Sequence, residues 1–102
     1  MASEATDWAA LLAHLRRTFP LRRPLTVRRI PLKKNAGTTS LSDGDRLTIC
    51  INTRKTWEVQ VDTLLHEYAH AMELDRWGDH SDRWGKYHAG LYRAWQDWMA
   101  GR

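Results

Sequence analysis

The sequence is poor in cysteine, proline and phenylalanine, and it has no long apolar run. Its 102 residues include one Cys, three Pro and one Phe. A lone cysteine, Cys50, excludes an internal disulfide framework. No stretch approaches the roughly 18 apolar residues of a membrane-spanning helix, and Glu4 and Asp7 stand where a secretory signal would carry positive charge. We therefore expect a cytoplasmic protein with no membrane partner.

The length of the chain limits its organisation. A chain of 102 residues has room for one compact domain with a modest core. Six tryptophans help to fill such a core, because each large ring buries much apolar area at little cost in rotamer entropy. We predict a single domain over residues 1–102.

Positive charge is concentrated early in the chain. Eight of the sixteen basic residues lie within segment 16–34, whereas only Glu4 and Asp7 are acidic before residue 42. A basic face can attract nucleic acid or an acidic protein. The alternative is a solvated surface of arginines on strand edges and turns. Nucleic-acid contact through segment 16–34 is therefore one hypothesis for a partner.

The first half of the chain reads as a helix followed by strands. Apolar residues at helical spacing predict a helix from Glu4 to about Thr18, which Pro20 terminates. Alternation predicts a strand over Leu25–Ile30, with Arg28 and Arg29 on its polar side, and a further strand contains Leu47, Ile49 and Ile51. Between these lies a Thr/Ser-rich strand, Gly37–Leu41, followed by a hairpin turn at Asp43-Gly44.

The second half reads as two helices. The first has Thr53 or Thr56 as its N-cap, runs to about Trp77 and stops at Gly78. Ser81 or Asp82 is expected to cap the final helix, whose apolar stripe is Trp84, Tyr87, Leu91, Trp95 and Trp98. Gly85 is expected to let this last helix approach the preceding one closely. The predicted fold class is α+β: an N-terminal helix, a small three-stranded sheet and two further helices.

A metal-binding motif lies inside the longest predicted helix. His66-Glu67-Tyr68-Ala69-His70 is an HExxH sequence. Residues four apart share a helix face, so His66 and His70 can converge on one Zn²⁺. Glu67 projects about 100° round the helix, beside the ion, where its carboxylate can act as general base toward the attacking water. The alternative without a metal site is two solvent-facing histidines beside an ordinary helix-forming glutamate.

A catalytic zinc site needs a third protein ligand. We favour His80, ten residues after His70 and beyond the expected helix stop, because a loop ligand can adjust to the metal. His88, Glu73 and nearby aspartates stay open as alternatives. Tyr87 and Tyr92 receive no role, and His14 is expected to be an exposed helix residue. Cys50 is expected to be a small buried residue and no metal ligand.

The stretch Asp62–Tyr92, from DTLLHEYAHAM to DHSDRWGKYHAGLY, resembles the SprT-like zinc metallopeptidases, a branch of the zincins. The resemblance implies a minimal zincin-like domain, with His66, His70 and His80 as zinc ligands and Glu67 as the general base. Trp84 matches an aromatic residue that follows the third histidine in this family. The family often has Gly-Pro-Glu after that histidine, where this chain has Ser81-Asp82-Arg83.

These observations predict a zinc-dependent endopeptidase that acts on a protein or peptide substrate. An exposed edge at Gly37–Leu41 could hold an extended substrate by main-chain pairing. Two alternatives compete with this function. One is a non-catalytic module, zinc-stabilised or basic, that binds nucleic acid or protein. The other is a metallohydrolase of another substrate class, since the same chemistry serves amides and esters.

Overall fold

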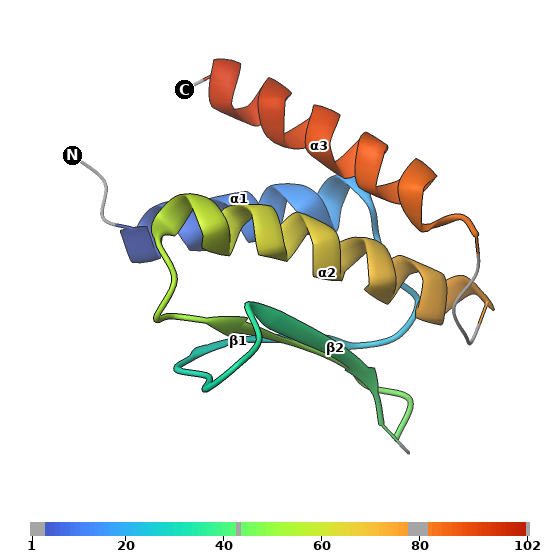
Figure 1. Cartoon of the computed structure of the whole chain (residues 1–102). Coiled ribbons are helices and arrows are strands. Elements are labelled where there is room, and N and C mark those ends of the chain that lie inside the picture. Colours follow the sequence, from blue (N-terminus) through green and yellow to red (C-terminus); the bar gives the residue numbers. More distant parts are fainter. Residues whose placement is uncertain (1–3, 43, 78–81, 102) are drawn as a thin grey trace.

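The computed structural model describes residues 4–42, 44–77 and 82–101, and its elements follow the predicted α+β order (Figure 1). Helix α1 is followed by three strands and then by helices α2 and α3. Their bounds are α1 (Glu4–Thr18), β1 (Leu25–Ile30), β2 (Gly37–Leu41), β3 (Leu47–Asn52), α2 (Trp57–Trp77) and α3 (Trp84–Ala100). The predicted limits of α1, β1 and β2 and the end of α2 are confirmed.

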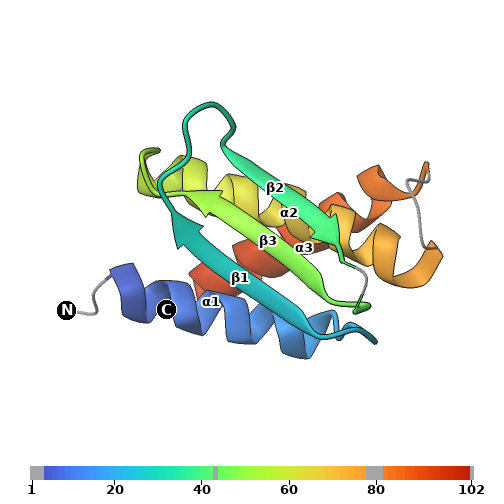
Figure 2. The ribbon, with the colours of Figure 1, turned by 90° about the horizontal axis from the view of Figure 1, so that it is seen from below.

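The three strands form a mixed sheet in the order β1-β3-β2. Strand β1 runs parallel to β3, with Val27 opposite Ile49, and β2 runs antiparallel to β3, with Thr39 opposite Ile49. Figure 2 shows β3 between its two neighbours, with α2 behind β2. Within the described part of the chain, β2 therefore has a paired side and an unpaired side.

The elements stack in layers above the sheet. In Figure 1 the sheet lies lowest, α1 and α2 lie above it, and α3 crosses on top. Helix α2 contacts β2 and β3 on one side and α3 on the other, while α1 also contacts α3. Helix α2 is therefore the central element, and any side chain on its flank lies between the sheet and α3.

The core forms where α2 meets the sheet and the other helices. Leu47, Ile49 and Ile51 alternate along β3 and are fully buried, and Leu64 on α2 and Leu91 on α3 are fully buried as well. Removal of these side chains from water is the main stabilising contribution to the fold. The predicted apolar faces of β3 and α2 are confirmed, and Trp57 at the start of α2 is half-buried against the core.

The N-cap predictions for α2 and α3 have different outcomes. At α2, the Thr56 hydroxyl accepts a hydrogen bond from the Val59 amide at 3.3 Å, so Thr56 and not Thr53 is the N-cap. At α3, the N-cap is Arg83, in αR conformation and with no side-chain cap bond. The prediction of Asp82 as cap was wrong, because α3 begins at Trp84, one residue later than an Asp82 cap requires. Ser81 and Gly78 lie outside the described residues.

The β2–β3 connection is a tight turn, as predicted. The Ser42 amide donates to the Arg46 carbonyl and the Asp45 amide donates to the Ser42 carbonyl, each at 3.0 Å. Asp43 lies outside the described residues. Among those described, Asp45 adopts the left-handed conformation at φ 58°, which a short polar side chain tolerates.

Three sequence expectations were wrong. Arg29 does not share the polar side of β1 with Arg28: it faces the helices, 4.9 Å from the Trp8 ring, and donates to Gln60. His14 is half-buried, with Nε2 3.3 Å from the Ala94 carbonyl oxygen on α3. A Cβ at Gly85 would meet open space, so this glycine mediates no close approach.

No helix in the described ranges has the length and apolarity needed to cross a bilayer.

Candidate metal centre

Helix α2 brings the two motif histidines together on its flank. The Nε2 atoms of His66 and His70 are 3.2 Å apart, and the ring centroids are 4.9 Å apart. The His66 side chain is 49% exposed and that of His70 is 26% exposed. The predicted convergence of the two imidazoles is therefore present, and their nitrogens are accessible from outside the core.

The spacing of these nitrogens suits one tetrahedral ion. Two nitrogens at 2.0–2.1 Å from a tetrahedral zinc lie about 3.3–3.4 Å from each other, close to the 3.2 Å between the two Nε2 atoms. The same distance suits a hydrogen bond between two neutral imidazoles, so the separation alone does not select a metal. The surroundings of each ring provide the further test.

Glu73 orients the His70 ring. Its Oε1 lies 3.2 Å from Nδ1 of His70, and the residue is only 1% exposed. A carboxylate at Nδ1 favours the proton there and leaves the Nε2 lone pair for an ion, as in carboxylate–histidine–zinc arrangements. Glu73 was one alternative for the third ligand. The structure places its carboxylate against the ring nitrogen that does not face His66.

Glu67 is held between α2 and strand β2. The Thr39 hydroxyl donates to Oε1 of Glu67 at 2.7 Å and lies 3.0 Å from the Glu67 carbonyl oxygen. The other carboxylate oxygen, Oε2, lies 3.9 Å from Nε2 of His66. Glu67 is 8% exposed. A neighbouring strand thus fixes this carboxylate beside the histidine pair. An ordinary helix-forming glutamate on the surface would need no such contact.

A glycine on β2 makes room for Glu67. A Cβ built on Gly37 would lie 2.6 Å from Cγ2 of Thr63, 2.9 Å from the carbonyl oxygen of Cys50 and 3.3 Å from Cγ of Glu67. Gly37 and Thr39 are two residues apart and face α2 together. The sequence pattern placed both in a strand but did not show their contact with Glu67, because strand–helix packing is not encoded locally.

Aromatic side chains of α3 cover the outer side of the histidines. The indole Nε1 of Trp84 donates to the His66 carbonyl at 3.0 Å, and its ring centroid lies 4.7 Å from that of His66. His88 stacks on Trp84 at 4.7 Å with an interplanar angle of 13°. His88, a rival for the third ligand, is therefore beside the site, with its ring centroid 6.4 Å from that of His66.

The favoured third ligand, His80, lies outside the described residues. Within the ranges that are described, no three His, Cys, Asp or Glu side chains gather as a metal site would require. The end of α2 contacts the beginning of α3. Trp77 Nε1 donates to the Tyr87 hydroxyl at 3.0 Å, and the Arg83 guanidinium lies 3.9 Å from the Trp77 ring centroid. Tyr87 thus contacts Trp77 at the helix ends. Cys50, which was expected to be buried, is a free cysteine and is only half-buried.

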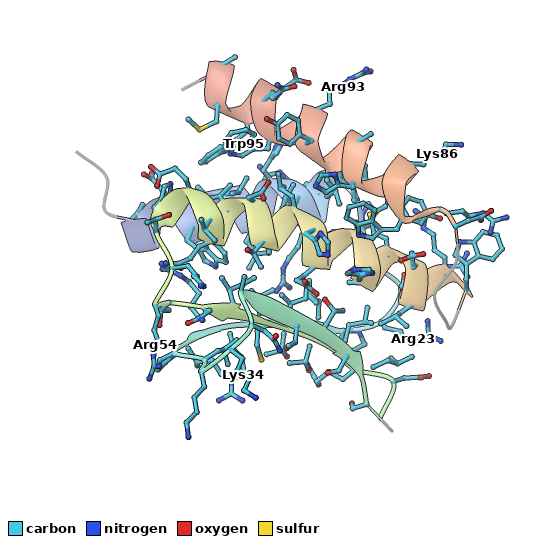
Figure 3. All side chains as sticks on the ribbon, in the orientation of Figure 1. Arg23, Lys34, Arg54, Lys86, Arg93 and Trp95 are labelled. Carbon is cyan, nitrogen blue, oxygen red and sulfur yellow. The ribbon has the colours of Figure 1, made fainter. Side chains whose placement is uncertain are left out.

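The basic side chains of segment 16–34 do not all lie on one exposed surface. Arg23 pairs with Asp45 at 3.4 Å and with Asp75 at 3.6 Å, and Arg29 faces the core as described above. The other six basic residues of the segment are exposed and are Arg16, Arg17, Arg22, Arg28, Lys33 and Lys34. They come from α1, β1 and the connections that follow each of them. Figure 3 shows Lys34 and Arg54 on the side of the sheet away from α2. Nucleic-acid contact stays a prediction.

Comparison with known proteins adds no relative: no family model matches the chain, and no curated protein or solved structure matches it.

Proposed function

We propose that the chain is a zinc-dependent endopeptidase of the SprT-like kind. The observation that carries this proposal is the arrangement of Glu67, buried between α2 and β2 by its bond from Thr39 and set beside the paired Nε2 atoms of His66 and His70. A purely structural metal site has no need of a fixed carboxylate next to its ligands. The arrangement therefore favours hydrolysis over a non-catalytic module.

The histidines are proposed to hold the ion. His66 and His70 supply two ligands through Nε2, and His80, expected from the sequence, supplies the third. When bound, zinc supplies Lewis-acid chemistry, which polarises the scissile carbonyl and makes water nucleophilic near neutral pH. Glu73 holds the His70 ring in one tautomer, with Nε2 directed at His66.

Glu67 is proposed to be the general base. Thr39 donates to Oε1, which leaves Oε2 as the less engaged oxygen to accept the proton. Oε2 takes a proton from the attacking water and delivers it to the leaving amine nitrogen as the C–N bond breaks. Because Glu67 is nearly buried, its carboxylate changes little in position between these two transfers.

Strand β2 is proposed to hold the substrate. It is an edge strand in the described part of the sheet, and it carries Thr39, which contacts Glu67. An extended peptide that pairs with the outer edge of β2 would run past the flank of α2 (Figure 3). Main-chain pairing of this kind accepts many sequences, so selectivity must come from other contacts.

The test is a comparison of cleavage and zinc content in the wild type and Glu67→Gln. The amide keeps the shape of the side chain and can still accept the Thr39 hydrogen bond, but it is no base. We expect equal zinc content and at least a hundredfold loss of casein or peptide cleavage, the range typical for loss of a general base. Asp97→Asn, which changes an exposed carboxylate on α3, should cleave like the wild type.

Two results would contradict the proposal. Undiminished cleavage by Glu67→Gln would show that another group moves the proton or that a contaminant cleaves. A zinc-loaded wild type that cleaves no peptide in a diverse set would favour the non-catalytic module instead.

A further inference from the structure

A second feature adjoins the candidate metal centre. A cavity of about 470 Å³ lies at the opposite end of α2 from Trp77, between the first turns of α2, the second half of α3 and the start of α1. Its volume is that of a small-ligand pocket. The mechanism proposed above makes no use of it.

Aromatic side chains form a large part of the walls of this cavity. They include three tryptophans and one tyrosine: Trp57, Tyr92, Trp95 and Trp98. Tyr92 is 40% exposed, and its ring lies 5.4 Å from that of Trp95. Figure 3 labels Trp95 on the inner side of α3, where it points toward the other helices. Faces of indole and phenol rings attract cations, and tryptophan does so best.

Carboxylates line the same cavity. Glu58 and Asp62 lie one turn apart on α2, and Asp7 reaches it from α1. Glu58 and Asp62 are exposed, and in the described part of the structure neither is paired with a basic side chain. None of the described lining residues is basic, although the chain has a net charge of +4. The local charge is therefore opposite in sign to that of the whole molecule.

We propose that this cavity binds an arginine side chain of the peptide substrate; its role in substrate choice rests on the proposed peptidase function. A guanidinium is planar and weakly hydrated, so it stacks on indole rings while its five N–H donors reach carboxylates. The fold already contains one such contact, since Arg29 lies 5.7 Å from the ring centroid of Trp57. The aliphatic part of the arginine side chain suits the apolar walls.

The cavity is close enough to the histidines to act on the same peptide. Asp62 precedes His66 by one helical turn, about 6 Å along the axis of α2. On α3, the rings of His88, Tyr92 and Trp95 follow one another at 6.3 Å and 5.4 Å. An extended peptide advances about 3.3 Å per residue. The arginine would thus lie about two or three residues from the cleaved bond.

Direct binding tests the cavity without any cleavage. The full chain, as Glu67→Gln and loaded with zinc, is titrated with an acetylated, amidated Gly-Gly-Arg-Gly-Gly peptide and with its citrulline counterpart. Citrulline keeps the shape of arginine but is uncharged. Indole N–H signals of Trp57, Trp95 and Trp98 in NMR spectra report contact at the cavity. We expect these signals to shift, and the arginine peptide to bind about tenfold more tightly than the citrulline peptide.

The matched variants are Glu58→Gln with Asp62→Asn, and Asp97→Asn alone as control. The double variant should lower the affinity for the arginine peptide about tenfold, and the control should leave it unchanged. Equal affinity for arginine and citrulline, or unchanged binding by the double variant, would overturn the cavity assignment. Arginine binding at the indoles without any Glu67-dependent cleavage would support the cavity and remove the peptidase proposal. Glu67-dependent cleavage without arginine preference would do the reverse.

Discussion

The hydroxyl of Thr39 donates a 2.7 Å hydrogen bond to the carboxylate of Glu67, which links an edge strand to the centre of the HExxH helix. Thr39→Val removes this bond and preserves the branched shape that suits a strand. We expect peptide cleavage to fall about tenfold while zinc content stays constant, because the carboxylate loses its fixed orientation. Thr39→Ser should restore most of the rate. Equal rates for the valine and serine variants would show that the hydroxyl does not position Glu67.

Glu73 provides a second prediction, on metal affinity. Its buried carboxylate contacts Nδ1 of His70, and loss of such a partner typically weakens metal binding 10–100-fold. Glu73→Gln should therefore release zinc at lower chelator concentration than the wild type, at unchanged stoichiometry. The measurement is zinc competition with a chromogenic chelator. An unchanged affinity in a folded variant would mean that the Glu73–His70 contact is only structural.

The third ligand can be identified by zinc content. His80→Ala should lose most of the metal, because a catalytic zinc site uses three protein ligands and His66 and His70 provide two. His88→Ala should retain it, since the His88 ring is engaged in stacking on Trp84. Both variants are compared by elemental analysis after dialysis. Full occupancy in His80→Ala together with loss in His88→Ala would reverse the assignment.

The elements of the fold were predictable because each repeats a local pattern. Alternation of Leu47, Ile49 and Ile51 marked β3, and these side chains are the buried centre of the sheet. Arg29 was misplaced because a strand has two faces, and its guanidinium is accepted inside by groups from two other elements: the Trp8 ring of α1, and the Trp57 ring and Gln60 side-chain oxygen of α2. That environment is a tertiary property that alternation along β1 does not reveal.

Part of the site was also local in origin. His66 and His70 meet because residues four apart share a helix face, so their convergence followed from spacing alone. Thr39 and Gly37 were missed, because they reach Glu67 only through the packing of β2 on α2. Sequence offers one weak signal for them: both fall on one side of the alternation in a strand that begins with a glycine.

Tyr68 makes stability depend on pH. Burial raises the pKa of Tyr68 to about 12, with Arg16 lowering it and Asp75 raising it, and the hydroxyl donates to the Phe19 carbonyl at 2.7 Å. Since the folded pKa lies above the ordinary 10, the stabilisation is complete below pH 10 and is lost as the pH rises to 12. The loss is about 2–3 kcal/mol of unfolding free energy.

Tyr68→Phe isolates this contribution, because every other ionisable group is common to both proteins. Denaturant unfolding with a chelator present should show the wild type more stable below pH 10 by about 1 kcal/mol, the usual value of one hydrogen bond. This difference should then shrink and reverse toward pH 12. Parallel pH profiles for the two proteins would mean that Tyr68 ionises equally in the folded and unfolded chains.

Replacement by alanine should change the free energy of unfolding in opposite directions at Gly37 and at Gly85. In Gly37→Ala the new methyl group would press on Cγ2 of Thr63 at 2.6 Å and on the Cys50 carbonyl at 2.9 Å. The Cys50 oxygen belongs to the backbone of β3 and cannot turn away, and Thr63 lies on α2, so β2 must shift relative to both neighbours, at a cost of about 1–3 kcal/mol. In Gly85→Ala the methyl enters open space on a helix, where alanine is favoured by about 1 kcal/mol. Chemical denaturation of both variants measures the two changes, and cleavage should fall only in Gly37→Ala, because that shift carries Thr39 away from Glu67. A Gly37→Ala protein as stable and as active as the wild type would show that β2 does not fix the distance between Thr39 and the base.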